Sequence, residues 1–254
     1  MEKDDGSITT SSCASPDRSA ISVSSIGTSA TEASAIIASA SVATRIGIVS
    51  IEAGESGLSR VVLPRIDMET LKNLPTSPRI HPLFIDASVT LAQIGIDFPM
   101  CDHSSICQMA ASNSVPVYGS VSWDGVPPSE IVSAACRDIK LFFEGELDPG
   151  RLWFDYPLKL PAGSDFAREV MVGMTRIAPG RVTAYGALAA AAGRPRAARA
   201  TGAIVGANPL PLVVPCHRVV GVGGRLTGYG GGLPLKVALL AMEQTIINRT
   251  GVLG

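Results

Sequence analysis

A cysteine followed directly by a histidine, Cys216-His217, is the pair in this chain best suited to nucleophilic chemistry. A thiol with its free pKa of about 8.5 is only a few per cent thiolate at neutral pH, so it needs a neighbouring base. An imidazole can supply that base, directly or through a water, and an acid can orient the imidazole. The pair alone is modest evidence, because adjacent side chains on an extended strand point to opposite faces. A buried structural cysteine beside a surface histidine is then an equally good interpretation.

The segment that carries this pair is unusually rich in proline. Pro209, Pro211 and Pro215 fall within residues 208–219, where they favour an extended backbone and block a helix. The apolar run 212–214 favours burial of the same segment. A reactive cysteine placed here would lie on a stiff, buried loop.

Helices on both sides must position this loop. The sequence predicts a helix over 165–177 with Ser164 as its N-cap, a second over 185–192 stopped by Gly193, and a third opened by Pro195 and running to Val205. The second and third have the outline of a helix-turn-helix, although packed helical hairpins that bind no DNA share it.

A last helix beginning near Pro234 aligns Glu243 with apolar residues and Lys236 along one side. A glutamate near the end of a helix is usually a solvated charge. On a partly apolar face it needs a partner, and His217 is a candidate.

The N-terminal half is less regular. Apolar runs at 46–51 and 58–63 around a glycine-containing turn predict a β-hairpin, and 131–144 predict a helix that places Cys136 in the core. A strand is expected at 153–158, whereas 65–128 give no clear assignment. Residues 1–42, dominated by Ser, Thr and Ala, predict a disordered tail with a short helix near 33–40. The expected domains are therefore 1–42, 43–160 and 161–250.

The charge distribution is uneven although the formal net charge is −1. No Asp or Glu occurs from Arg176 to Lys236, which predicts a basic surface that fits a polyanion, or alternatively a solvated basic face with no partner. The basic residues of this stretch are Arg176, Arg181, Arg194, Arg196, Arg199, Arg218, Arg225 and Lys236.

Other classes of site and location are disfavoured. No apolar run reaches the ~18 residues of a membrane span, and an acidic N-terminus argues against a secretory signal. Five unevenly spaced cysteines do not form a disulfide framework, so we expect a reducing, cytoplasmic setting. The spacing of Cys101, His103 and Cys107 does not match a zinc knuckle, and we expect no metal.

The run Val214-Pro215-Cys216-His217-Arg218-Val219 resembles the active-site motif of the O6-alkylguanine-DNA alkyltransferases, also called methylated-DNA–protein-cysteine methyltransferases. The resemblance is nearly continuous from Asp165 to Glu243, while the N-terminal half matches loosely. It also rests on Tyr185-Gly186-Ala187-Leu188-Ala189, on Pro195-Arg196-Ala197-Ala198-Arg199-Ala200, on Asn208-Pro209 and on Leu226-Thr227-Gly228-Tyr229-Gly230-Gly231-Gly232-Leu233.

This resemblance implies an α/β (α+β) fold. A small antiparallel-sheet, ribonuclease H-like N-terminal domain would precede a mainly helical, winged-helix-like helix-turn-helix domain. It implies irreversible, stoichiometric transfer of a methyl or other alkyl group from O6-alkylguanine in double-stranded DNA, without a cofactor, by a monomer.

The resemblance also implies roles for four catalytic residues. Cys216 would accept the alkyl group and His217 would deprotonate it through a bound water. Glu243 would complete the relay. Tyr185 would donate a proton toward the guanine and help to rotate the nucleotide.

Five further residues are implied to bind DNA or the flipped base. Arg199 would fill the gap in the base stack, Asn208 would hold the turn before the active site, and Val219 would contact the base through its backbone. Tyr229 would wall the alkyl pocket, and Lys236 would approach Cys216 or DNA.

The sequence departs from the family pattern in places. Phe166-Ala167 and Met171 stand where the family usually has Phe-Gln and Trp, and Gly230 stands where many members have Ser or Ala. Three other functions stay open: a protein that binds alkylated DNA without transfer, although such relatives replace the cysteine; a cysteine hydrolase, which needs an oxyanion hole; and a regulator fused through the tail or the unassigned middle.

Overall fold

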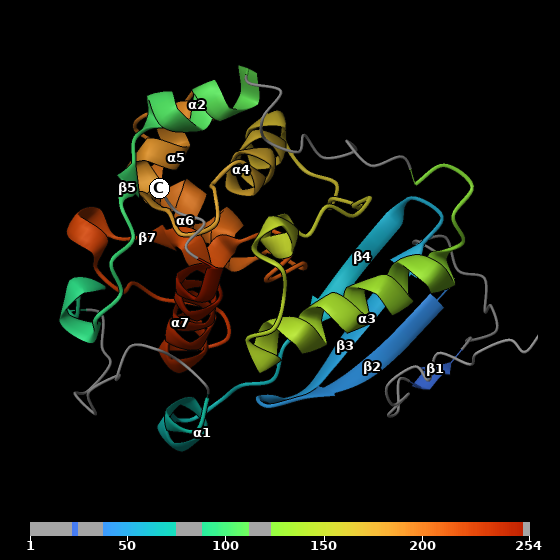
Figure 1. Cartoon of the computed structure of the whole chain (residues 1–254). Coiled ribbons are helices and arrows are strands. Elements are labelled where there is room, and N and C mark those ends of the chain that lie inside the picture. The colour runs from blue at the N-terminus through green and yellow to red at the C-terminus, as the bar shows by residue number, and fades with distance from the viewer. Residues whose placement is uncertain (1–21, 25–37, 75–87, 112–122, 251–254) are drawn as a thin grey trace, which may run out of the picture.

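A computed structural model describes residues 22–24, 38–74, 88–111 and 123–250. It has two parts: a sheet crossed by helix α3, and a group of helices formed mainly by residues 165–250 (Figure 1). This arrangement confirms the expected mixed α/β fold with a helical C-terminal region. The likeness to ribonuclease H and the domain boundary expected between residues 160 and 161 stay predictions.

The sheet is antiparallel with the order β1-β2-β3-β4, formed by Ser22–Ser24, Ala38–Thr44, Gly47–Gly54 and Gly57–Val62. Gly47 and Gly57, with φ of 116° and 110°, supply the turn conformations that L-residues rarely adopt. The predicted hairpin is therefore confirmed as β3 and β4. Alternate residues such as Val49 and Ile51 are fully buried, as period-two packing on one face requires.

Helix α3, Pro128–Glu144, packs on β2 and β3 and confirms the predicted helix (Figure 1). It ends at Gly145 in the left-handed conformation. Cys136 on its inner face is wholly buried, and burial raises its pKa to about 11. Cys136 is thus a core residue, as predicted, and its thiol is not an activated nucleophile.

Two N-terminal predictions are wrong. The expected tail contains most of strand β2, and residues 38–40 of the expected helix are its first residues; residues 33–37 lie outside the described chain. Ala38, Ala40 and Val42 point inward while serines alternate with them, and this period-two signal is weak because alanine is small. The strand expected at 153–158 is also wrong: Pro149–Trp153 form a 3₁₀ turn, and only Leu158 makes an isolated bridge, to Leu58.

Residues 65–128, which the sequence left unassigned, contribute elements that pack on the C-terminal helices in the described part of this stretch. They form α1 (Met68–Lys72), a 3₁₀ turn at Ala92–Ile94, β5 (Met100–Cys101) and α2 (His103–Ala111). Strand β5 pairs in parallel with β6 (Val182–Ala184), which pairs in parallel with β7 (Val219–Val220). The apolar piece at 115–118 lies outside the described residues.

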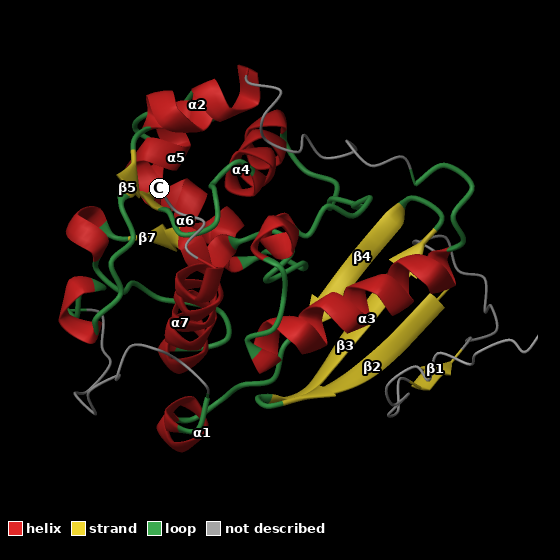
Figure 2. Ribbon diagram, viewed as in Figure 1, coloured by secondary structure: helices red, strands yellow, loops and turns green. Residues whose placement is uncertain are grey.

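The C-terminal helices follow the predicted order and surround this small parallel sheet (Figure 2). Helix α4 is Asp165–Thr175, and the Ser164 hydroxyl accepts a hydrogen bond from Ala167 N at 3.2 Å, which confirms the N-cap. Helix α5 is Tyr185–Ala191 and α7 is Leu233–Thr250. Helix α6, Ala198–Gly206, begins three residues after the predicted Pro195 and packs on α5.

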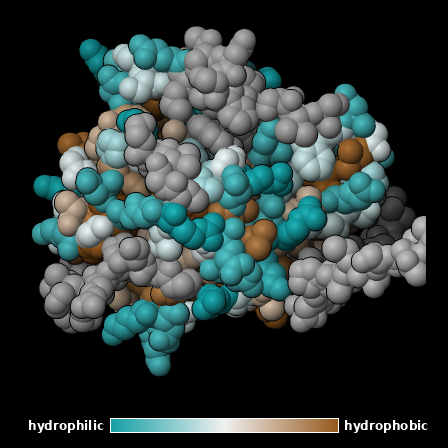
Figure 3. Space-filling model, viewed as in Figure 1, coloured by the Kyte–Doolittle hydropathy of each residue, from teal (hydrophilic) through white to brown (hydrophobic). Residues whose placement is uncertain are grey.

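The surface carries few large apolar side chains. Ile48, Val62, Met100 and Val222 are the large hydrophobic residues exposed in the described chain. On the face in Figure 3, hydrophilic residues predominate and hydrophobic ones lie in small separate groups. None of the described helices is both long enough and apolar enough to cross a bilayer.

Candidate active site

The segment with Cys216 is not extended, contrary to the sequence prediction. Leu212 has φ of 73°, and Cys216–Arg218 form one turn of 3₁₀ helix before β7. Successive residues of a 3₁₀ turn are about 120° apart, so the side chains of Cys216, His217 and Arg218 diverge. The thiol lies on a cavity wall while the other two side chains enter the core, and all three are buried.

Asn208 fixes the loop that leads to Cys216. Its Nδ2 donates to the carbonyl of Val214 at 2.8 Å, and its Oδ1 accepts from Leu210 N at 3.0 Å. The loop closes on itself with a bond of 2.7 Å from Val214 N to Leu210 O. This geometry agrees with the role that the resemblance implies for Asn208.

A buried network lies behind the thiol. His217 Nε2 is 2.9 Å from Glu243 Oε1, and the same oxygen accepts from Arg218 Nε at 2.8 Å. The Glu243 Oε2 accepts from Gly180 N at 3.3 Å. His217, Arg218 and Glu243 are essentially unexposed, so Glu243 on α7 has the histidine partner that the sequence proposed and a cation that it did not.

Arg218 is a residue of this buried network that sequence reasoning missed. It was counted as part of a basic surface, but its guanidinium also donates to Ile177 O at 2.8 Å and to Leu152 O at 3.0 Å. Every polar contact of this side chain is thus inside the protein. The apolar residues around it in sequence were the available signal for burial.

The electrostatics of the network favour an ionised Glu243 and a neutral His217. Burial by itself would raise the pKa of Glu243, but the charge of Arg218 and the hydrogen bond with His217 outweigh it and lower the pKa to about 2. Burial lowers the pKa of His217 below its ordinary 6.5, against the opposing effect of Glu243. A carboxylate that holds Nε2–H leaves Nδ1 of the neutral ring as the acceptor, and Nδ1 has no hydrogen-bond partner among the described residues.

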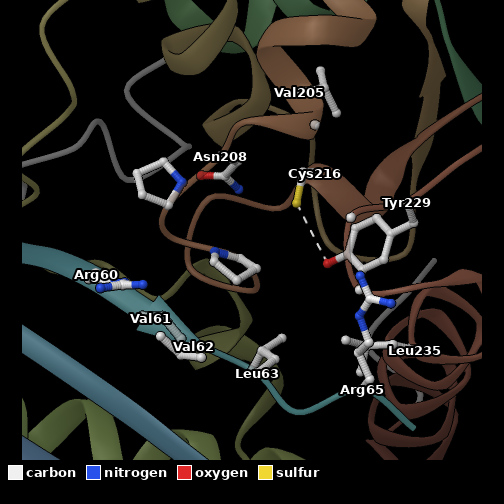
Figure 4. A pocket seen from close by; sticks show the side chains of 15 residues that line it. Arg60, Val61, Val62, Leu63, Arg65, Val205, Asn208, Cys216, Tyr229 and Leu235 are labelled. Carbon is white, nitrogen blue, oxygen red and sulfur yellow. Dashed lines mark hydrogen bonds between the residues drawn. The ribbon is translucent and has the colours of Figure 1, made fainter.

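The thiol itself is un-ionised at rest. Burial raises the pKa of Cys216, while hydrogen bonds with Asn208 and Tyr229 and the charge of Lys236 lower it less strongly. Its Sγ donates to the Tyr229 hydroxyl at 3.6 Å, the contact drawn in Figure 4. A thiolate therefore forms only when a base takes the proton.

Lys236 is placed differently from the prediction of a DNA contact. The side chain is wholly buried, and its Nζ donates to the Val219 carbonyl at 2.6 Å. Burial lowers its pKa to about 8, while the nearby Cys216 raises it. The expectation that Lys236 approaches Cys216 agrees with this geometry, whereas Lys236 and Arg218 both leave the expected basic surface.

The remaining predicted residues lie around the same region. Burial raises the pKa of Tyr185, and its hydroxyl accepts from Thr227 Oγ1 at 3.2 Å. Arg199 on α6 and Arg196 just before that helix are both exposed, so they remain available to a polyanion. Val219 is fully buried and its carbonyl accepts from Lys236, so the structure does not present it to the cavity as the resemblance implies.

A cavity of about 340 Å³ opens beside Cys216 (Figure 4). Its walls come from β4, the end of α6, the active-site loop and the start of α7, and Arg60 and Arg65 line it as cations that the sequence did not identify. The lining residues are Arg60, Val61, Val62, Leu63, Arg65, Val205, Gly206, Asn208, Pro209, Pro211, Cys216, Tyr229, Gly230, Gly231 and Leu235.

Comparison with known proteins finds methylated-DNA–protein-cysteine methyltransferases. Residues 165–245 match the family model described as "6-O-methylguanine DNA methyltransferase, DNA binding domain". A methylated-DNA–protein-cysteine methyltransferase of Methanosarcina acetivorans is 39% identical over 48% of this chain and 74% of its own length. The chain belongs to the methylated-DNA–protein-cysteine methyltransferase family.

Other members of this methyltransferase family agree. That of Mycolicibacterium paratuberculosis is 46% identical over 44% of this chain, and the match spans 65% of its length, just under two thirds. That of Salmonella typhimurium is 56% identical over 34% of this chain and 50% of its length. The crystal structure of Mycobacterium tuberculosis OGT in complex with DNA has a TM-score of 0.50 and 28% identity, covering 81% of this chain and 92% of that one.

Membership of the methyltransferase family confirms the resemblance identified in the sequence. The residue roles that the resemblance implies rest on the geometry above. Within the described part of the chain, His, Cys, Asp and Glu form no group of three that could hold a metal ion.

Proposed function

We propose that this protein repairs DNA by moving a methyl or other alkyl group from O6 of guanine to the Sγ of Cys216, once per molecule. The observation that carries the proposal is the thiol of Cys216 on a cavity wall. It is next in sequence to the buried His217, whose Nε2 is hydrogen-bonded to the ionised Glu243. Membership of the methyltransferase family supports the same reaction.

The proton of Cys216 leaves through His217. The neutral ring has Nδ1 free to accept, and a bridging water between thiol and ring would satisfy this buried nitrogen. Glu243 stabilises the imidazolium that forms, because its low pKa keeps it anionic. The charge of Lys236 stabilises the thiolate.

The transfer itself is a substitution at the alkyl carbon. A bond forms from Sγ to that carbon, the carbon–O6 bond breaks, and the electron pair stays with guanine. Neutral guanine is a better leaving group than its anion, so a proton from the hydroxyl of Tyr185, whose raised pKa keeps it protonated, assists departure. The thioether product has no second nucleophile to release it in this scheme, so each molecule acts once, and no cofactor enters the balance.

DNA is bound through α5 and α6. A base inside a duplex cannot reach a cavity wall, so the nucleotide must be turned out at an unstacking cost of a few kcal/mol. Arg199, exposed on α6, would offset part of that cost by occupying the gap and contacting phosphate. We propose that the protein acts as a monomer on double-stranded DNA in the cytoplasm.

Counting products tests the proposal against its alternatives. Purified protein is mixed with excess duplex carrying one O6-methylguanine, and restored guanine is measured against protein concentration over time. We expect one equivalent and no more, and none from Cys216→Ala, while Cys136→Ala restores one equivalent if folded, because Cys136 is inert in the core. Binding without restored guanine would indicate a lesion-binding protein, and continued turnover would indicate a hydrolase; either result contradicts the proposal.

A further inference from the structure

The cavity beside Cys216 must take the flipped guanine together with its O6-alkyl group. Its volume is about 340 Å³, within the size range of small-molecule sites. Apolar side chains of Leu63, Val205 and Leu235 contribute to its walls, so they can cover the methylene groups of a longer alkyl chain. The lining therefore suits alkyl groups longer than the methyl group of the transfer proposed above.

The charged residues that line this cavity are all cationic. Arg60 lies on β4 and Arg65 follows that strand; in Figure 4 the two stand on different sides of the cavity, with Arg65 near Tyr229. Among the described lining residues there is no Asp or Glu. Lys236, close enough to Cys216 to affect its pKa, adds a third positive charge at the thiol end.

The two arginines are available to a ligand. Both are exposed, and neither forms an ion pair with another described residue. Glu52 lies directly across from Arg60 in the register of β3 and β4, but no ion pair joins them. A guanidinium offers five N–H donors in a planar fork that fits a carboxylate.

Resting on the proposed alkyl transfer, we infer that this pocket selects O6-alkyl groups that end in a carboxylate, with Arg60 and Arg65 as its specificity determinants. The transferred group then lies beside the guanine in the same cavity, with its reacting methylene at Cys216 and its carboxylate toward Arg60 or Arg65. A bond forms from Sγ to that methylene, the carbon–O6 bond breaks, and guanine leaves with the electron pair and a proton. The product is an S-carboxyalkylcysteine.

A matched pair of substrates isolates the charge. Duplexes carry O6-carboxymethylguanine or the neutral isostere O6-carbamoylmethylguanine, and a second pair has two further methylenes in each chain. Single-turnover transfer rates give the ratio of acid to amide for each length. We expect the ratio to exceed one for at least one length, and to fall about fivefold in Arg60→Gln or Arg65→Gln and further in the double variant, as expected for exposed ion pairs.

Arg45→Gln is the matched control, because Arg45 is an exposed arginine in the β2–β3 turn and does not line the cavity. This variant should keep the wild-type ratio. An acid-to-amide ratio of one or less at both lengths in the wild type would overturn the inference. So would equal slowing of acid and amide in both arginine variants, which would assign Arg60 and Arg65 to DNA phosphates.

O6-Methylguanine in the same duplex separates this inference from the proposed function. If the wild type transfers the methyl group but shows no preference for the acid over the amide substrates, only the inference is contradicted. A wild-type protein that transfers none of the groups contradicts the proposed function itself.

Discussion

Replacing Glu243 by glutamine removes the negative charge to which Arg218 and His217 are both hydrogen-bonded. Glutamine keeps nearly the same shape, so the loss is mainly electrostatic. The variant leaves a guanidinium that is 1% exposed without its counter-charge, and breaking a buried ion pair in this way costs about 3–5 kcal/mol.

The pKa shift of Glu243 gives a second estimate of how much its charge stabilises the fold. The pKa of Glu243 falls from 4.5 to about 2 on folding, and at about 1.36 kcal/mol per unit this contributes about 3 kcal/mol of stability. Because the folded pKa is the lower one, this contribution is complete above 4.5 and is lost as the pH falls toward 2. The stability difference between wild type and Glu243→Gln should therefore be largest at neutral pH and shrink below 4.5.

Urea unfolding followed by circular dichroism at neutral pH and at several values below 4.5 measures this difference. Glu144→Gln is the control, because Glu144 is partly exposed and its ion pair with Lys140 is 4.0 Å long. That pair is worth less than about 1 kcal/mol. A Glu243→Gln variant as stable as the wild type at neutral pH, or a difference that stays constant on acidification, would refute the reasoning.

Three further predictions concern activity. Tyr185→Phe removes the proton donor and should slow methyl transfer about 100-fold or more in a single-turnover assay; an unchanged rate would exclude the donor role. Arg199→Ala should weaken binding to duplex DNA by about 1–3 kcal/mol in a fluorescence titration, and a loss no greater than that of the exposed control Arg168→Ala would contradict it. The transfer rate should stay level as the pH falls to 6.5 and decline only below it, because the pKa of the base His217 is lowered in the fold; a decline already above 6.5 would contradict this assignment.

The sequence predicts the elements whose signals are local. The hairpin β3–β4, α3, α4 and the cap Ser164 follow from periodicity and turn residues, and the structure confirms them. Strand β2 could not be found, because its inward side is mostly alanine and its outer side is serine. The prediction of an extended active-site segment was wrong, because prolines exclude a long helix but permit the single 3₁₀ turn at 216–218.

The sequence predicts the site residues that belong to a recognisable motif. It misses those whose placement depends on contacts between distant parts of the chain. His217 and Glu243 pair in the core as proposed, and Cys216, next in sequence, lies on the cavity wall. Arg218 and Lys236 were expected at the surface because charged residues are seldom buried without partners. Arg218 donates to the carbonyls of Leu152 and Ile177 and to the carboxylate of Glu243, and Lys236 donates to the carbonyl of Val219; only the folded chain brings these groups together. The arginines of the cavity were missed for the same reason, since β4 is remote from the active-site loop in sequence.

The central claim is that Cys216 is the alkyl acceptor, and peptide mapping by mass spectrometry tests it most directly. After reaction with a duplex that contains O6-methylguanine, the protein is digested and every cysteine-containing peptide is analysed. We predict one methyl group on Cys216 and none on the described cysteines Cys101, Cys107 and Cys136 or on Cys13. Methyl on another cysteine, or guanine restored with Cys216 unmodified, would contradict the account.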